Sequence, residues 1–233
     1  MNKFYGLWDD FISLLFPRLC CGCGEPLVRN ENVVCTSCLL EIPLTGYHLS
    51  PGNPAEQLFW GRCRVEKAAA YSFYTRGSRI RKIIHKLKYD GIEEAGRHMG
   101  RIYALALRQS GFFNDIDLIL PVPLHPDKQK KRGFNQCSCI CDGISEVCQL
   151  PVDSGTLIRS SISDTQTRKS RYDRWLNVEG IFQLTDPSKL KGKHVLLVDD
   201  VITTGSTLEA CINALSIAEG IKVSVVALAI AVQ

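Results

Sequence analysis

Two adjacent aspartates stand where a run of apolar residues gives way to hydroxyl-bearing ones. The stretch VLLVDDVITTGST covers residues 195–207 and places Asp199 and Asp200 directly after four apolar positions. An uninterrupted apolar run of this kind predicts a buried strand, and ligands of open α/β sheets bind beyond the carboxyl ends of such strands. The pair is a candidate site, because carboxylates accept hydrogen bonds from hydroxyl groups and coordinate divalent cations.

The residues after the aspartates predict a place for a phosphate group. Gly205 lets the backbone bend and approach a ligand closely, and successive N–H groups ahead of a helix form a cradle for an anion. A phosphorylated ribose suits both halves of the stretch, since its hydroxyls can donate to the carboxylates while its 5′-phosphate lies in the loop. The hydroxyl groups that line this loop belong to Thr203, Thr204, Ser206 and Thr207.

A second group of reactive side chains lies near the start of the chain. Two C-x-x-C pairs, Cys20/Cys23 and Cys35/Cys38, have eleven residues between them. Two such turns aim four thiolates at one point and predict a closed tetrahedral zinc site, which is structural because it leaves no open position. Cys21 is an alternative to Cys20 as a ligand, although Cys20 gives the better spacing.

The composition is that of a globular protein with free thiols. The chain has 233 residues, 45% of them hydrophobic and 22% charged, and a formal net charge of +4, which permits anionic partners without requiring them. The chain has eleven cysteines, a high and odd number, whereas a typical disulfide scaffold is a smaller protein with an even number of cysteines. No stretch approaches the roughly 18 apolar residues of a membrane helix, and the N-terminus lacks an export signal. We therefore expect a cytoplasmic protein without a membrane span.

The pattern of apolar residues predicts a three-part chain with an α/β fold. We expect an N-terminal helix and the zinc module in 1–45, a linker in 46–64, and an α/β domain in 65–233 with a mostly parallel sheet flanked by helices. Strands are predicted at 65–74, 117–122, 155–159, 177–184, 194–199 and 222–231, and helices within 76–91 and at 92–109, 135–149 and 206–219.

The segment 76–91, RGSRIRKIIHKLKYDG, which holds a predicted helix, is strongly basic. Its apolar stripe consists of Ile80, Ile83, Ile84 and Leu87, at helical spacing. Six arginines and lysines between residues 76 and 88 occupy the remaining surface. They form either a solvated outer face or a face that binds anions.

The motifs and their order resemble a known family. VLLVDDVITTGST resembles the signature of type I phosphoribosyltransferases, in which two acidic residues precede a loop that binds phosphoribosyl pyrophosphate. The order of the C-x-x-C pairs, KLKYDG, PVPLHPDKQKKRGFNQ, TQTRKSRYDRWLNVEGIF and VDDVITTGST resembles the ComF family of competence-associated, phosphoribosyltransferase-like proteins over about residues 10–231.

This resemblance implies roles for three segments. Asp199 and Asp200 would be catalytic, and residues 203–207 would bind the 5′-phosphate of phosphoribosyl pyrophosphate. The loop after strand 117–122 would receive the pyrophosphate through its backbone amides and either Lys131 or Arg132, unless it is only a basic solvated loop. The residues concerned are Leu124, His125, Lys131 and Arg132 in that loop, and Gln166, Arg168 and Arg171 in a flexible loop that closes over the site.

The resemblance also implies a reaction and a biological setting. A nucleophile would displace pyrophosphate from C1 of the ribose while Mg²⁺ shields the leaving group. The acceptor is not evident, and we expect any hood that holds it to come from residues before 117. The alternative is a non-catalytic protein that keeps the ligand site as a sensor or scaffold. Either form would act in DNA uptake, with single-stranded DNA or competence proteins as partners.

Overall fold

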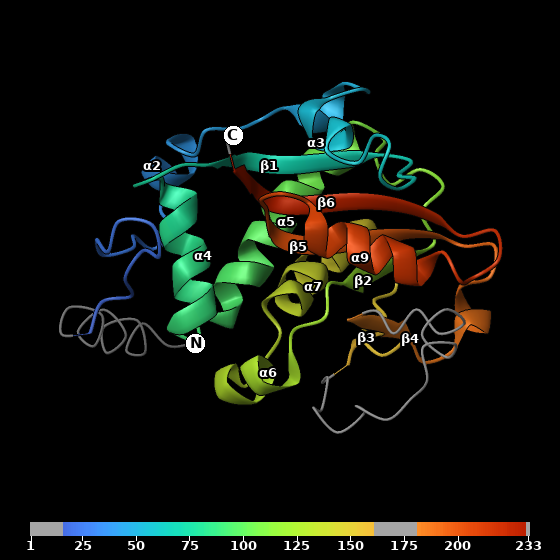
Figure 1. The fold of residues 1–233 in the computed structure, drawn as a ribbon. Coiled ribbons are helices and arrows are strands. Elements are labelled where there is room, and N and C mark those ends of the chain that lie inside the picture. Colours follow the sequence, from blue (N-terminus) through green and yellow to red (C-terminus); the bar gives the residue numbers. More distant parts are fainter. Residues whose placement is uncertain (1–15, 161–180, 232–233) are drawn as a thin grey trace, which may run out of the picture.

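The computed structural model describes residues 16–160 and 181–231, and in this part of the chain the central element is a parallel sheet (Figure 1). Its strands lie in the order β1–β6–β5–β2, and every neighbouring pair is parallel. The strands span Ala68–Tyr74 (β1), Leu118–Pro121 (β2), His194–Ile202 (β5) and Lys222–Ala231 (β6).

Helices cover both faces of this sheet, as Figure 1 shows. Side chains of β5 alternate between two cores: Leu196 and Val198 lie in one, and Val195 and Leu197 in the other. The first core is closed by α4 (Arg79–Tyr89), α5 (Glu93–Gln109) and α7 (Gln136–Cys148), and the second by α3 (Pro54–Gln57) and α9 (Ser206–Leu215). The expectation of a mostly parallel sheet flanked by helices is confirmed.

Two predicted strands form a separate small sheet. β3 (Leu157–Arg159) and β4 (Phe182–Leu184) pair antiparallel with each other, and Leu157 and Phe182 pack into the core beside α9. The remaining short elements are α2 (Thr36–Leu40), η1 (Tyr47–Leu49), α6 (Pro126–Arg132) and η2 (Pro187–Leu190). None of the helices in the described ranges is long and apolar enough to cross a membrane.

The predicted linker has a defined position against the sheet. Asn53 starts α3 by accepting hydrogen bonds from the N–H groups of Ala55 (2.9 Å) and Glu56 (3.3 Å), and its amide donates to the carbonyl of Ala68 in β1 (2.9 Å). Phe59 is 1% exposed. These contacts dock the segment on β1 and the core. The division at residues 45 and 64 stays a prediction, and the predicted N-terminal helix lies outside the described residues.

Helices α5 and α7 approach each other closely along a seam of small residues. A Cβ atom added to Gly100 would lie 2.3 Å from the carbonyl oxygen of Ile140, and one added to Gly143 would lie 2.0 Å from that of Arg97. Gly96 faces Cys139 in the same seam, where an added Cβ would lie 2.9 Å from the cysteine Cβ. Only glycine permits this separation, so the seam fixes α7 on the sheet.

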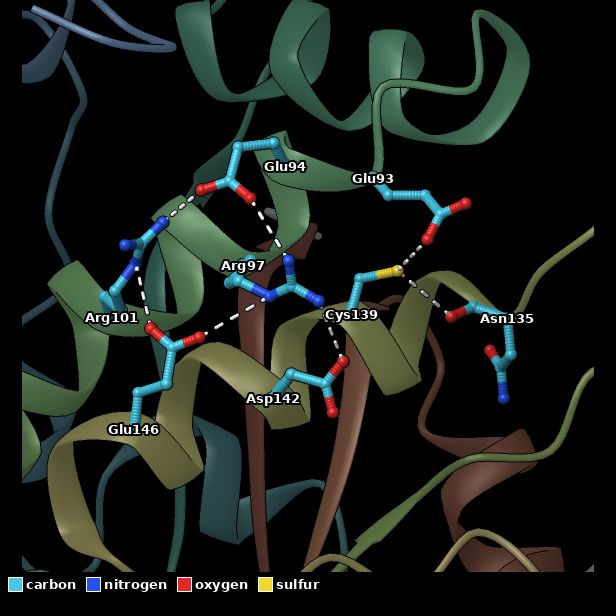
Figure 2. A network of polar contacts seen from close by, with 8 residues as sticks. All are labelled: Glu93, Glu94, Arg97, Arg101, Asn135, Cys139, Asp142 and Glu146. Carbon is cyan, nitrogen blue, oxygen red and sulfur yellow. Dashed lines mark hydrogen bonds and ion pairs between the residues drawn. The ribbon is translucent and has the colours of Figure 1, made fainter.

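Charged side chains bridge the same two helices at the surface (Figure 2). Arg97 of α5 pairs with Asp142 (3.4 Å) and Glu146 (3.5 Å) of α7, and Arg101 also pairs with Glu146 (3.4 Å). Glu94 contacts both arginines from within α5. Exposed pairs of this kind contribute little individually, so the close packing beneath them holds the helices together.

We predict that Gly100→Ala destabilises the protein, although alanine normally favours a helix over glycine. The added methyl group would meet the backbone of α7, and overpacking of a tight core costs typically about 1–3 kcal/mol. Urea denaturation measures the change in the free energy of unfolding. Gly155→Ala is the matched control, because its nearest neighbour would be 3.8 Å away. A Gly100→Ala protein as stable as the parent would contradict the packing described for this seam.

Candidate functional site

The two aspartates lie inside β5 and not after its end. Val201 and Ile202 continue the strand by pairing with Ala229 and Ile230 of β6, so the predicted boundary at residue 199 is wrong. Neighbouring residues of a strand point to opposite sides. Asp199 and Asp200 therefore contact different neighbours near the carboxyl end of β5, but one oxygen of each carboxylate still lies within 4.8 Å of the other.

The carboxylate of Asp199 is held by groups from two elements. Its Oδ1 accepts hydrogen bonds from the N–H of Asp200 (2.8 Å) and from the thiol of Cys137 at the start of α7 (3.5 Å). Burial, together with the neighbouring charge of Asp200, raises the pKa of Asp199 to about 7. A half-buried carboxylate of this kind gains from a ligand that brings positive charge or hydroxyl donors.

Asp200 is paired with a lysine that the sequence reading did not assign to the site. Its side chain is 6% exposed, and its Oδ1 lies 2.7 Å from Nζ of Lys88 in α4. Its other oxygen, Oδ2, is buried and has no hydrogen-bond partner among the described residues. Although burial disfavours the Lys88 ammonium, attraction by Asp200 raises the pKa of Lys88 above its ordinary value.

Helix α4 brings Lys88 to this position. The helix begins soon after the end of β1, and its last turn reaches Asp200 of β5, on the far side of β6 in the strand order. It therefore crosses the carboxyl end of the sheet (Figure 1). Ile80, Ile83, Ile84 and Leu87 anchor it in the core, which confirms the predicted apolar stripe.

The loop after β5 has the form expected of an anion site. Gly205 has φ +75°, a conformation that favours glycine, and α9 begins at the next residue. Gly205 has no side chain to cap α9, and Thr204 Oγ1 accepts a hydrogen bond from the N–H of Ser206 (3.4 Å), so the first N–H groups of the helix face the loop. The exposed members of the loop are Thr203, Thr204, Ser206 and Thr207.

Arg62, from the predicted linker, supports this loop and was missed by the sequence reading. Its guanidinium donates to the carbonyl of Thr204 (2.9 Å), lies 3.5 Å from the hydroxyl of Ser206, and pairs with Glu209 of α9. Phe59 packs beneath Gly205, where an added Cβ would lie 3.4 Å from its ring. No local motif marks Arg62, because its partners are more than a hundred residues away in the chain.

The predicted pyrophosphate loop contains a helix, α6, that the sequence reading did not anticipate. His125 starts it, with Nδ1 accepting a hydrogen bond from the N–H of Asp127 (3.2 Å). Arg132 bonds to Gln136 and lies 5.8 Å from the ring centre of Tyr89, while Lys131 is exposed. Leu124 lines a hollow of about 610 Å³ between this loop and β3.

Lys131 and Arg132 have different surroundings, since Arg132 contacts Gln136 and Tyr89 while Lys131 is exposed. A pyrophosphate role for them stays a prediction. The flexible-loop candidates Gln166, Arg168 and Arg171 lie outside the described residues.

The four predicted zinc ligands come together in space. The sulfur atoms of Cys20, Cys23, Cys35 and Cys38 all lie within 4.8 Å of one another. Cys21 is buried but is not part of this group. Four clustered thiols match the donor set that zinc prefers, and the cluster could hold such a metal.

Backbone N–H groups point at these sulfur atoms, as a thiolate site requires. Sγ of Cys20 accepts from the N–H groups of Gly22 (3.3 Å) and Cys35 (3.2 Å), and Sγ of Cys35 accepts from that of Cys38 (3.4 Å). Although burial opposes it, these backbone hydrogen bonds lower the pKa of the Cys20 thiol to about 6. Gly22 is needed for the close turn, because an added Cβ would lie 2.8 Å from Sγ of Cys38.

The cysteines of α7 have a structural place. Cys137, Cys139 and Cys141 are buried, and Cys148 is half-buried. Cys139 packs against Gly96 of α5. Burial raises the pKa of the Cys137, Cys139 and Cys141 thiols, so they behave as small apolar groups.

Comparison with known proteins gives matches over most of the chain. Residues 149–232 match the phosphoribosyl transferase domain. DNA utilization protein YhgH of Salmonella typhi is 30% identical over 210 residues, covering 84% of this chain and 89% of that protein. Competence protein F of Haemophilus influenzae is 28% identical over 198 residues, covering 81% and 86%. Competence protein ComFC of Bacillus subtilis is 26% identical over 200 residues, covering 78% and 77%.

The domain match includes β5, the acidic pair, the following loop and β6. Together with the observed sheet, it confirms the predicted fold class, a type I phosphoribosyltransferase-like sheet with a cysteine cluster near the N-terminus.

We predict that the purified protein carries about one zinc ion per chain, as a structural four-cysteine site does. Cys38→Ser should lose the metal and destabilise the protein, because metal binding supplies folding free energy that this small module cannot replace. Metal analysis by mass spectrometry and thermal melting check both effects. Cys148→Ser is the control, since Cys148 lies outside the cluster and should keep the metal. A parent protein that contains no metal and is nevertheless stably folded would contradict the assignment of these cysteines as zinc ligands.

Proposed function

This chain belongs to the ComF family, and from that premise we propose that it binds phosphoribosyl pyrophosphate with Mg²⁺ at the carboxyl end of β5. One observation carries the proposal. A half-buried and a buried carboxylate, the second with an oxygen that has no partner among the described residues, stand next to an exposed hydroxyl-rich loop that opens a helix. The first feature suits the hydroxyls of a ribose or a divalent cation, and the second suits its phosphate.

Each half of the site has a separate task in this proposal. The N–H groups and hydroxyls of residues 203–207 bind the 5′-phosphate, and Arg62 fixes the loop through the carbonyl of Thr204. Asp199 and Asp200 accept hydrogen bonds from the ribose hydroxyls and orient the sugar. Carboxylate oxygens also suit Mg²⁺, which would supply charge compensation for the pyrophosphate.

With an acceptor present, this arrangement supports transfer of the phosphoribosyl group. The reaction forms a bond from the acceptor nucleophile to C1 of the ribose and releases pyrophosphate. The carboxylates stabilise positive charge that develops on the sugar ring. Helix α4 is the described element that crosses the carboxyl end of the sheet, so we assign the acceptor-facing hood to the region before residue 117.

We predict that the double variant Asp199→Asn/Asp200→Asn binds Mg²⁺·phosphoribosyl pyrophosphate at least about tenfold more weakly than the parent, since hydrogen bonds to charged groups contribute roughly 1.5–3 kcal/mol each. Calorimetric titration measures both affinities. Glu219→Gln is the control, because Glu219 is exposed and pairs with Lys191 away from the site. Undetectable binding to the parent protein, or equal binding to the double variant, would refute the proposed site.

A second function, binding of single-stranded DNA, is favoured by one surface feature. The ring of Tyr89 is 69% exposed at the end of basic helix α4. His85 packs against it at 4.7 Å between ring centres, and the Arg132 guanidinium lies 5.8 Å from its centre. An exposed aromatic ring among cations suits a stacked base with its phosphate. The names of the relatives refer to DNA utilization and competence, and we propose that this chain likewise acts in DNA uptake.

We predict that oligothymidine binds this surface with an affinity that falls steeply as salt rises, through counterion release. Tyr89→Ala should weaken binding by about 1–3 kcal/mol, the contribution of one stacked base. Fluorescence anisotropy at several salt concentrations checks both effects. Trp60→Ala is the control, because Trp60 is another exposed aromatic residue, at 65%, outside α4. Binding that ignores salt, or that survives Tyr89→Ala unchanged, would exclude this surface.

A further inference from the structure

The ion pair between Lys88 and Asp200 is not explained by ligand binding at the acidic pair. The two side chains are 23% and 6% exposed, and the distance from Nζ to Oδ1 is 2.7 Å. Withdrawing both charges from water is expensive, and such a pair often adds little to stability. The ammonium also lies against the carboxylate that the proposed ligand needs. Lys88 therefore calls for a role other than holding the fold together.

The atoms around the ammonium form a site suited to a cation. One oxygen each of Asp199 and Asp200 and the sulfur of Cys137 all lie within 4.8 Å of one another. Asp200 is 4% exposed, and among the described residues its Oδ2 atom has no hydrogen-bond partner. Within residues 16–160 and 181–231, Lys88 makes the only ion pair to either carboxylate. Its ammonium therefore supplies the positive charge that these carboxylates require.

We propose that the Lys88 ammonium is the counter-ion of the acidic pair in the free protein. A divalent cation that binds at Asp199 and Asp200 displaces it. The inference rests on the proposed function, since it takes the acidic pair as the place where the cation arrives. In the free protein the ammonium compensates the buried charge of Asp200. On binding, the cation takes over this task and the ammonium leaves.

The structure gives the released side chain somewhere to go. Lys88 lines not only the acidic pair but also a hollow of about 690 Å³ along α4 and the cysteine loop. The lysine side chain is a flexible stem of four carbons. Rotation about its bonds can therefore carry the ammonium from Asp200 towards this hollow without moving the helix. Arg81, Lys82 and Lys86 lie on the wall of this hollow, together with Asp90, which pairs with Lys86. Exchange would add one more positive charge there.

Manganese binding without any phosphoribosyl pyrophosphate tests this role. Mn²⁺ is titrated into the full-length, zinc-loaded protein, and its affinity is measured from the electron paramagnetic resonance of the free ion. Lys88→Met removes the competing charge and should bind Mn²⁺ at least about tenfold more tightly than the parent, because two charges a few ångströms apart interact strongly even at a protein surface. Lys88→Arg keeps the charge and should bind as weakly as the parent.

Two controls separate exchange from general effects of charge. Lys86→Met removes the same charge from the same helix, but Lys86 pairs with Asp90 at 2.7 Å, so its Mn²⁺ affinity should match that of the parent. In an Asp200→Asn background the effect of Lys88→Met should vanish, since the shared carboxylate is gone. A folded Lys88→Met protein with unchanged or weaker Mn²⁺ affinity would overturn the proposal.

A measurement on the parent protein keeps the inference testable even if Lys88→Met fails to fold. Acetylation of lysines, followed by mass spectrometry, reports how accessible each ammonium is. Mn²⁺ should speed the labelling of Lys88 and leave that of Lys86 unchanged. Equal labelling of Lys88 at saturating Mn²⁺ would overturn the exchange. Because neither experiment contains phosphoribosyl pyrophosphate, its failure to bind would be a separate result.

Discussion

The placement of the helices around the sheet depends on two neighbouring carboxylates, Asp199 and Asp200, in the buried strand β5. Burial disfavours their negative charge, so the fold must bring compensating groups to β5 from elsewhere. The N–H of Asp200 and the thiol of Cys137 do so for Asp199, and the ammonium of Lys88 does so for Asp200. These partners come from α7 and α4, and both helices must therefore be placed accurately at the carboxyl end of the sheet.

The packing of the helices meets this requirement through short distances. Gly100 and Gly143 let α5 and α7 approach until their backbones nearly touch, which fixes the start of α7 and with it Cys137. Helix α4 packs into one core together with residues of the sheet and the buried cysteines Cys20, Cys21 and Cys38. The cysteine cluster and the acidic pair are thus linked through α4, although they are far apart in sequence.

The sequence predicted those parts of the molecule that local residue patterns encode. The apolar runs of β5 and β6, the stripe of α4, and the C-x-x-C pairs each predicted an element or cluster that the structure contains. The positions of Lys88 and Arg62 at the site were not predicted, because their partners Asp200 and Thr204 lie more than a hundred residues away and no spacing rule connects them. Helix α6 was not predicted for a different reason. Its sequence, PDKQKKR, has no apolar stripe, and the helix begins after the capping side chain of His125.

A crystal structure of the protein with Mg²⁺ and phosphoribosyl pyrophosphate would test the central claim most directly. Our account predicts electron density for the 5′-phosphate on residues 203–207 and for the ribose hydroxyls at Asp199 and Asp200. It also predicts that the Lys88 ammonium has left Asp200 for the hollow along α4. A ligand bound elsewhere, or a site that stays empty at saturating ligand while Lys88 remains on Asp200, would contradict it.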